Sequence, residues 1–349
     1  MRHSTLKDVA ELSGVSLATA SRALNNRGDV DPATRKKVLE AAKVLAYTPN
    51  PLARGLLSGA TKTIGVLVTT IQNPFYAAVV AGIEKELAAE GYTIILCNSH
   101  EDAAAEQTAI ALLLGRRVDG LIVAPVQSKP DGLSLLLESN VPFVFVARYV
   151  NGADSDYVVC DDEAVGRLAT EHLIARGHRR ILFLNSSRNS SAELRQRGYE
   201  ASLRSHGIPG DPALVRVVPG GQAERVMTEA LAEGLRPSAV FCFCDDMTVG
   251  VLRALAARGI RVPAEMAVIS CDNLPFTGLL QPPLTTVEIP EFEMGVAAVK
   301  VLLTKIKRHK KKTTQIILAP RLIERASTAG TLLPETPVGF TKNEDQVES

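Results

Sequence analysis

The chain has 349 residues, enough for more than one domain at roughly 100–200 residues each. Hydrophobic residues make up 46% of it, so sizeable cores can form, but no apolar run reaches the ~18 residues expected of a helical membrane span. The net charge of +1 does not by itself indicate nucleic-acid binding, yet residues 1–60 hold nine Lys/Arg against five Asp/Glu. A modestly basic head on a slightly acidic body is typical of local contact with DNA.

Residues 6–25 predict two short helices joined by a tight turn. In 6–13 the apolar residues recur at helical spacing, and Gly14 stands where a helix C-terminus needs a left-handed residue. Ser16 is a good N-cap for the second helix, from which Ala20 faces inward. Such a helix-turn-helix can place its second helix in a DNA major groove. Because the helical pattern begins at once, no cleavable signal sequence is expected.

A third helix is predicted to begin just after residue 31. Asp31 can cap it, and Pro32 suits its first turn, where the missing N–H is not needed. Its packing stripe is expected to consist of Val38, Leu39, Ala42 and Leu45.

The second helix carries the residues that we expect to contact DNA. Leu17 and Ala18 are apolar at its start and suit thymine methyl groups, whereas Arg22 can form a bidentate hydrogen bond to guanine. Small polar side chains suit phosphate oxygens, which fix the register without reading the sequence. The candidates for these phosphate contacts are Ser16, Thr19, Ser21 and Asn25.

Residues 50–57 predict a short hinge helix. Asn50 can cap this helix, and Pro51 fits its first turn. Gly55 costs about 1 kcal/mol relative to Ala, so we expect the helix to be marginal by itself. Two such hinges lying side by side on DNA could fold together.

Both N-terminal segments resemble the lactose/galactose-repressor (LacI/GalR) family. Residues 6–25 are similar to its N-terminal signature, and 47–57 to its hinge. The resemblance extends to about residue 328 and implies a homodimer that binds palindromic, double-stranded operator DNA without a cofactor. It also implies that Leu56 wedges between base pairs in the minor groove, with Ala53 beside it, which is a known way of bending DNA.

The body of the chain predicts an α/β fold. From residue 62, short apolar runs such as 64–68 and 240–243 alternate with amphipathic segments such as 76–89, a pattern typical of parallel sheets flanked by helices on both faces. These units are too many for one sheet, so two similar lobes are expected, with a ligand at the carboxyl ends of the strands. The resemblance implies a two-lobed effector domain similar to periplasmic sugar-binding proteins of type I. An all-α helix-turn-helix head precedes this domain in the sequence.

Four segments make up the expected domain organisation. Residues 1–48 form the DNA-binding domain, 49–61 the hinge helix and linker, 62–330 the effector-binding domain, and 331–349 a disordered tail. The resemblance implies that the chain crosses between the lobes near 159–163, 286–291 and 319–323. The N-lobe would then hold about 62–160 and 290–319, and the C-lobe about 161–287 and 320–330.

Candidate ligand residues follow the strand-like runs. Asn73 and Phe75 belong to a stretch that resembles the family's N-P-F-Y loop, and Arg195 belongs to one that resembles its R-x-x-G-[FY] pattern. Carboxylates and guanidinium groups can hold vicinal hydroxyls, while an aromatic ring covers the apolar face of a sugar. The remaining candidates are Arg148, Asp161, Asp245, Asp272 and Phe276, with Tyr76 as another possible ring. Asp162 and Asp246 are expected to cap helices instead.

The effector class stays open between three possibilities. A phosphosugar would need more basic groups than the two arginines provide, so we expect a neutral sugar, a polyol, or a sugar acid held by Arg148 and Arg195. Asp245 stands where relatives often carry Asn, and 270–273 differs from the commoner G-[FY]-D-[DN], which leaves the ligand's identity undecided.

Two further features of the sequence, a basic run and the cysteines, are interpreted as structural rather than functional. The basic run 307–312 is interpreted as a solvated loop rather than a second DNA-binding patch. No cysteine pair has zinc-ligand spacing, so buried free thiols and no metal site are expected. The cysteines are Cys97, Cys160, Cys242, Cys244 and Cys271.

The sequence thus predicts a cytoplasmic transcriptional regulator, a repressor released from its operator by a sugar-like effector. A repressor that needs a corepressor is the alternative within the same class. A sugar-binding protein or an enzyme is the alternative from another class, although phosphate-loop, H-E-x-x-H and G-x-S-x-G patterns are absent. His172 and His178 are interpreted as surface residues rather than catalytic groups.

Overall fold

The computed structural model describes residues 4–25, 28, 30–47, 60–127, 129–187, 189–308 and 312–330. It divides into two compact units, Met1–Lys62 and Thr63–Ser349, which we describe separately. The predicted hinge at 50–57, with Ala53 and Leu56, lies outside the described residues, as do the tail from 331 and part of the basic run.

The N-terminal unit contains three helices, α1 (Leu6–Ser13), α2 (Leu17–Leu24) and α3 (Pro32–Val44). The predicted turn chemistry is confirmed, because Gly14 has a left-handed φ of 68° and the Ser16 side chain accepts a hydrogen bond from the Thr19 N–H. Asp31 caps α3 in the same way, with Pro32 in the first turn.

The core of the head is small, and one predicted member does not belong to it. Val9, Ala20 and Val38 are fully buried at the centre of the three helices. Leu39 is 50% exposed, so its placement in the packing stripe was wrong. One residue along a helix turns by about 100°, so Leu39 is rotated away from the stripe of Val38, Ala41 and Ala42.

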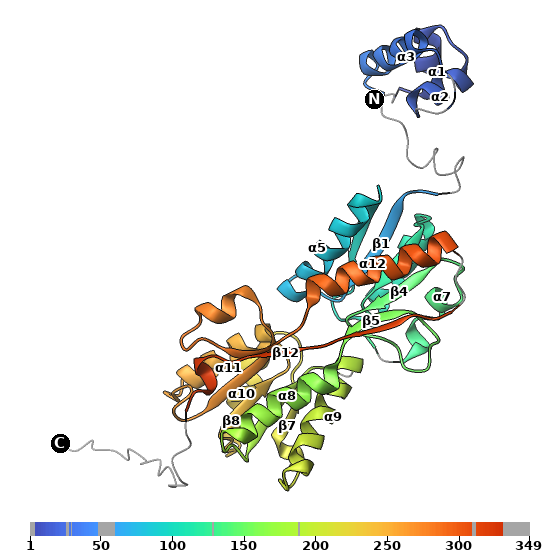
Figure 1. Ribbon diagram of the computed structural model, residues 1–349. Coiled ribbons are helices and arrows are strands. Elements are labelled where there is room, and N and C mark those ends of the chain that lie inside the picture. The colour runs from blue at the N-terminus through green and yellow to red at the C-terminus, as the bar shows by residue number, and fades with distance from the viewer. Residues whose placement is uncertain are drawn as a thin grey trace, which may run out of the picture. The chain divides into compact units, whose positions relative to one another are not determined.

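The N-lobe is built on a six-stranded parallel sheet with the order β11-β5-β4-β3-β1-β2. Helices α5 and α12 cover one face, and α6 and α7 the other (Figure 1). Neighbouring strand residues point to opposite faces: Val66 packs in the core under α5, and Leu67 in the core under α6. The elements are β1 (Thr63–Val68), α5 (Pro74–Ala89), β2 (Thr93–Asn98), α6 (Ala103–Gly115), β3 (Gly120–Val123), η1 (Pro130–Gly132), α7 (Ser134–Leu137), β4 (Phe143–Val146), β5 (Tyr157–Cys160), α12 (Glu291–Arg308) and β11 (Gln315–Leu318).

The C-lobe repeats this plan with the strand order β12-β10-β9-β8-β6-β7. Its sheet is parallel except for β12, which runs antiparallel to β10. Helices α8 and α9 cover one face, and α10 and α11 the other. The elements are α8 (Asp162–Ala175), β6 (Ile181–Asn185), α9 (Ser190–Ser205), η2 (Pro212–Leu214), β7 (Val215–Val217), α10 (Ala223–Ala232), β8 (Ala239–Cys242), α11 (Asp245–Ala256), β9 (Ala267–Asp272), η3 (Pro275–Leu279), β10 (Thr285–Glu288), β12 (Arg321–Ile323) and η4 (Ala326–Thr328).

The chain passes between the two sheets three times (Figure 1). The passages lie between β5 and α8, between β10 and α12, and between β11 and β12. One continuous apolar core runs through both lobes. The two-lobed α/β architecture predicted from the strand–helix alternation is confirmed.

Two helix pairs, one in each lobe, pack backbone against backbone at glycines. In the N-lobe, a Cβ on Gly82 of α5 would lie 2.2 Å from the Phe292 carbonyl oxygen of α12. In the C-lobe, a Cβ on Gly198 of α9 would lie 2.2 Å from the Glu163 carbonyl oxygen of α8. A side chain of any size is excluded at both crossings, so these glycines fix how closely the helices approach.

The two histidines of the C-lobe are buried, so their interpretation as surface residues was wrong. His172 Nε2 lies 2.8 Å from the Thr328 hydroxyl, and His178 Nδ1 lies 3.0 Å from the Ser238 hydroxyl. Burial lowers the pKa of each imidazole to about 4. Helical periodicity could not show that the segment around Thr328 folds back over α8.

Candidate functional site

The outward face of α2 presents a mixed apolar and cationic surface. Leu17 is 53% exposed, and Ala18 and Arg22 are exposed as well. A single exposed leucine is common on protein surfaces, so the exposure of Leu17 leaves it accessible without identifying a partner. Arg22 follows Ala18 by one helical turn, so the two share a face.

The polar residues of α2 already have partners within the head. The Ser16 hydroxyl lies 2.9 Å from the Thr19 hydroxyl, and the Asn25 side chain donates to the Ser21 carbonyl at 2.8 Å. These contacts hold the side chains in fixed positions at the helix ends. The described residues of the head do not test the expected contacts with bases and phosphates, which stay predictions.

In the body of the protein, a pocket with a cavity volume of about 50 Å³ lies where the two lobes meet. Five predicted ligand residues line it. The N-lobe contributes Asn73, Phe75 and Arg148, and the C-lobe contributes Arg195 and Asp272. These residues follow the carboxyl ends of strands or lie on the helices after them, where open parallel sheets bind ligands.

The aromatic wall of the pocket is formed at the start of α5. Asn73 caps this helix by accepting a hydrogen bond from the Phe75 N–H at 2.9 Å. Phe75 and Tyr76 meet edge to face with ring centroids 5.1 Å apart, and both line the pocket. The described pocket thus draws its ring from this loop, as the sequence allowed.

Phe276 does not reach the pocket. It lies on η3, packs against the main apolar core and is not among the residues that line the pocket, so its assignment as a ligand residue stays a prediction. The loop after β9 turns it toward the core because Leu274 and Thr277 anchor that loop through buried hydrogen bonds.

Arg148 follows β4 and forms an ion pair within the N-lobe. It is 6% exposed, and its two terminal nitrogens donate to the two carboxylate oxygens of Glu101 at 2.8 and 2.9 Å. Burial alone would raise the pKa of Glu101, but the charge of Arg148 and its hydrogen bonds hold that pKa below its usual value. Such bidentate pairs are strong and directional.

Arg195 forms the matching pair within the C-lobe. Its Nε donates to Asp162 Oδ1 at 2.8 Å, and its guanidinium stacks over Phe243 with 4.2 Å to the ring centroid. Arg195 and Asp162 are 4% and 3% exposed, so the ion pair is sealed from water.

The structure reverses the predicted roles of two neighbouring aspartates. Asp161 was expected in the pocket, but it is exposed and caps α8 by accepting from the Ala164 N–H at 2.9 Å. Asp162, expected to be a cap, lines the pocket and holds Arg195. The helix begins at Asp162, one residue earlier than the sequence suggested, which makes Asp161 the N-cap and places Asp162 in the first turn, facing inward.

Asp272 lines the pocket and carries a buried carboxyl oxygen, Oδ2, that has no hydrogen-bond partner among the described residues. Burial and the nearby Asp245 carboxyl raise the pKa of Asp272 well above its usual value. The residue has a φ of 114°, in the region that favours glycine, and such backbone strain persists only where the surroundings enforce it.

Asp245 supports this turn from behind and does not line the pocket. It is fully buried, and its carboxylate accepts hydrogen bonds from the Leu274 N–H and the Thr286 hydroxyl at 2.8 and 2.9 Å. Its assignment as a ligand residue stays a prediction that the described pocket does not support. Asp246 does not cap α11 as expected, because the N-cap position is Cys244, whose side chain makes no capping bond.

Metal coordination finds no support in the described residues, which contain no group of three His, Cys, Asp or Glu side chains able to hold a metal ion. The five cysteines are free thiols, and Cys160 and Cys244 line the pocket. Burial raises the pKa of both thiols, which keeps them protonated. They act as small, weakly polar parts of the pocket wall.

Glu106 makes the stability of the protein depend on pH. This α6 residue is 1% exposed, its Oε1 accepts from the Val126 N–H at 2.8 Å, and burial raises its pKa to about 7. Because the pKa of Glu106 is raised on folding, its contribution to the free energy of unfolding is complete below pH ~4.5 and is lost as the pH rises through 7. We expect Glu106→Gln to reduce the loss of unfolding free energy between pH 5 and 8 by about 1–3 kcal/mol. Urea titrations at four pH values measure this, with the exposed Glu224→Gln as the control; equal slopes for wild type and Glu106→Gln would contradict it.

Comparison with known proteins places the chain in a family. Residues 5–50 match the family model of bacterial regulatory proteins of the lacI family, and residues 170–328 match the periplasmic binding protein-like domain. The ribose operon repressor of Escherichia coli K12 is 35% identical over 327 residues, covering 93% of this chain and 99% of the relative. The chain belongs to the LacI family. The transcriptional repressor PurR of Aliivibrio fischeri is similar too, at 34% identity over 337 residues, covering 94% of this chain and 99% of the relative.

Solved LacI-family structures share the fold along almost the whole chain. The Lac repressor dimer bound to operator and the anti-inducer ONPF has a TM-score of 0.83 at 28% identity, and covers 94% of this chain and 99% of its own. The complex of the regulator CelR with cellobiose has a TM-score of 0.71 at 31% identity, with 93% and 99% coverage. The protein is therefore a DNA-binding transcriptional repressor that responds to a small-molecule effector, and not an enzyme.

One residue of the pocket wall and the ion-pair partner of another could not be singled out from the sequence. Asp162 was assigned elsewhere, and Glu101 was not considered, because no motif marks either residue. A usable signal existed for Glu101, since it closes a polar stretch directly after a β-strand, at the edge of the sheet where ligands bind. In the part of the chain that the structure describes, no helix is long and apolar enough to cross a membrane.

Proposed function

We propose that this LacI-family protein binds a palindromic operator as a homodimer and is released when a sugar-like effector enters the pocket between its lobes. The supporting observation is the pocket itself, where an aromatic wall, two arginines and the unpartnered oxygen of Asp272 converge from both lobes. The effector class comprises sugars, polyols and sugar acids, whose hydroxyls match these groups. Repression takes place in the cytoplasm, where the operator DNA lies.

The proposed switch follows from thermodynamic linkage. An effector changes operator affinity only if it binds the lobe arrangements of the two states unequally. A ligand held by Arg148 from one lobe and Asp272 from the other favours a closed arrangement. Closure changes the spacing of the two hinges and prevents them from folding together on DNA. The boundaries at 1–48, 49–61 and 62–330 serve this scheme, with the head, hinge and effector domain as separate units.

Gel retardation on a pool of palindromic DNA tests the proposal. We expect salt-sensitive, sequence-selective binding, because phosphate contacts dominate affinity and base contacts select the site. A thermal-shift screen of sugars and sugar acids identifies the effector, which is then added to the selected complex. Release of the DNA supports induction, whereas tighter binding identifies the corepressor alternative. Unchanged operator affinity with a bound effector would overturn the proposed switch.

In the proposed DNA complex Arg22 reads a guanine, and Leu17 and Ala18 contact thymine methyl groups. We expect Arg22→Ala to lower operator affinity by about 5–150-fold, equivalent to roughly 1–3 kcal/mol, and to relax base preference at one position of each half-site. Binding-site selection followed by sequencing measures both effects. Lys43→Ala, on the exposed side of α3, removes the same charge and should leave the base preference intact. An unaltered preference in Arg22→Ala would show that the recognition helix reads DNA through other residues.

A further inference from the structure

The charge balance of the effector pocket carries an inference about which ligands can enter. Arg148 and Arg195 both line the pocket, and two guanidinium groups would ordinarily favour an anionic ligand. Each is already paired with a carboxylate of its own lobe, Arg148 with the partly exposed Glu101 and Arg195 with the buried Asp162. The formal charges of these four residues cancel before any ligand binds.

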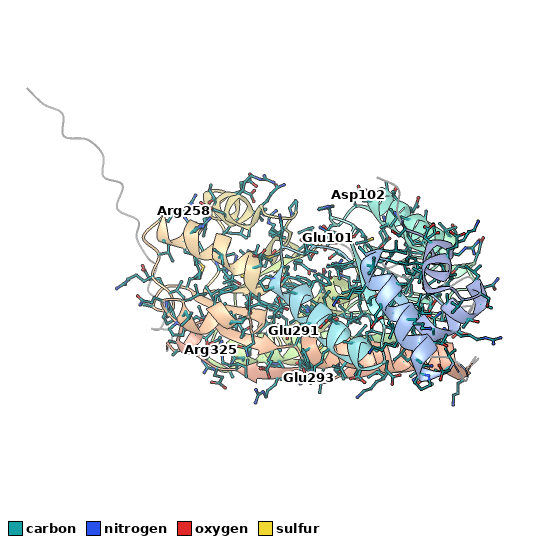
Figure 2. The ribbon with its side chains drawn as sticks, turned by 90° about the horizontal axis from the view of Figure 1, so that it is seen from above. Glu101, Asp102, Arg258, Glu291, Glu293 and Arg325 are labelled. Carbon is teal, nitrogen blue, oxygen red and sulfur yellow. The ribbon has the colours of Figure 1, made fainter. Side chains whose placement is uncertain are left out.

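Glu101 is held against Arg148 by an unusual local backbone. His100 and Glu101 have φ values of 54° and 57°, in the left-handed region that residues with side chains seldom adopt. The turn is secured by bonds from the Glu101 N–H to the Thr69 carbonyl and from the Asp102 N–H to the Ser99 carbonyl, at 3.2 and 2.9 Å. Figure 2 shows Glu101 on the side of the N-lobe that faces the C-lobe. Such strain is typical of positions fixed for a purpose.

The pairing limits what Arg148 can offer a ligand. A guanidinium has five N–H donors, and Glu101 takes one from each terminal nitrogen. Three N–H groups remain and can donate to hydroxyl oxygens of a neutral ligand. An anion placed against Arg148 would instead lie close to the Glu101 carboxylate, whose like charge repels it, although solvent partly screens this repulsion because Glu101 is 39% exposed.

We propose that Glu101 is a specificity-determining residue, whose carboxylate neutralises Arg148 and restricts the pocket to uncharged polyhydroxy ligands, excluding sugar acids. This proposal rests on the function proposed above and narrows its effector class. Glu101 acts through Arg148 as a positioning and charge-balancing residue. In the C-lobe, the Asp162 carboxylate balances the charge of Arg195 in the same way.

Glu101→Gln tests the proposal because it removes the charge and keeps the shape of the side chain. Sodium acetate is the probe, replacing sodium chloride at constant ionic strength in thermal unfolding of the full chain. We expect the variant to gain a saturable, acetate-dependent rise in midpoint, with an apparent affinity at least tenfold above that of wild type. Glu265→Gln is the matched control, since Glu265 pairs with Arg261 at 2.9 Å on the surface and should give no gain.

Three results would overturn the proposal: no gain in Glu101→Gln, an equal acetate response in wild type, or a gain that survives Arg148→Met in the double variant. A second measurement uses wild type alone and does not depend on the variant folding. Matched pairs are compared, D-glucose with D-glucuronate and D-galactose with D-galacturonate. A wild-type protein stabilised more by the acid than by its neutral partner contradicts the selectivity, whereas no stabilisation by either acid supports it.

Operator binding is measured in parallel on the same preparations. If wild type shows no sequence-selective DNA binding, the proposed function is contradicted, but the acetate result on Glu101 is unaffected. Selective DNA binding with no acetate gain in Glu101→Gln would sink the charge-balance proposal alone. The two failures are therefore distinguishable.

Discussion

Asp162→Ala is expected to lower the free energy of unfolding by about 3–5 kcal/mol, because removing one member of a buried ion pair leaves the other charge without compensation. Arg195 is 4% exposed, and its Nε depends on Asp162 Oδ1 at 2.8 Å. Its other described contacts, the Phe243 carbonyl and ring, carry no negative charge. Arginine keeps its proton in proteins, so the guanidinium cannot relieve the loss by neutralising. Urea unfolding of the full chain measures the effect.

Two further variants separate the ion pair from simple loss of packing. Glu163→Ala removes the neighbouring carboxylate, whose partner Arg197 lies 3.9 Å away on the surface, and should change stability by less than about 1 kcal/mol. The double replacement Asp162→Leu with Arg195→Met removes both buried charges and should recover most of the loss. A single Asp162→Ala variant as stable as Glu163→Ala would show that water or Asp272 compensates Arg195.

Much of the fold could be predicted because its determinants are local. Gly14, Ser16 and Asp31 each act within one helical turn, so the helices of the head could be placed from the sequence. In the body, the strands are short apolar runs whose alternation with helices specifies parallel sheets. Leu39 shows the limit of predicting burial from helical periodicity, because a shift of one position along a helix decides between burial and exposure.

The site was predicted less completely because it depends on contacts between distant segments. Asn73, Arg148 and Asp272 were found because polar residues after a strand reach the ligand edge of the sheet. Asp161 and Asp162 were interchanged because the start of α8 is set by tertiary packing rather than by a local motif. Glu101 pairs with Arg148 across 47 residues, and no spacing rule in the sequence links them.

Gly198→Ala is expected to destabilise the protein by about 3 kcal/mol, the upper end of the usual cost of overpacking, because the neighbouring backbone cannot easily move. The added Cβ would lie 2.2 Å from the Glu163 carbonyl oxygen and 2.8 Å from the Arg167 nitrogen, both backbone atoms of α8. The helices must separate to admit it, and because Arg195 lies one turn before Gly198, its bond to Asp162 lengthens as well. We therefore expect weaker effector binding together with the lower unfolding free energy.

Gly115→Ala supplies the contrast, because no atom lies within 4 Å of its added Cβ at the end of α6. There the same substitution should stabilise the protein by about 0.5–1 kcal/mol, through helix propensity and a less flexible unfolded chain. Chemical denaturation measures the change in free energy of unfolding for both variants. If the helix contact decides the outcome, this change is negative for Gly198→Ala and positive for Gly115→Ala. Equal, small effects would mean that α8 and α9 can move apart freely, and the glycine crossing would then not be what holds Arg195 in the effector pocket.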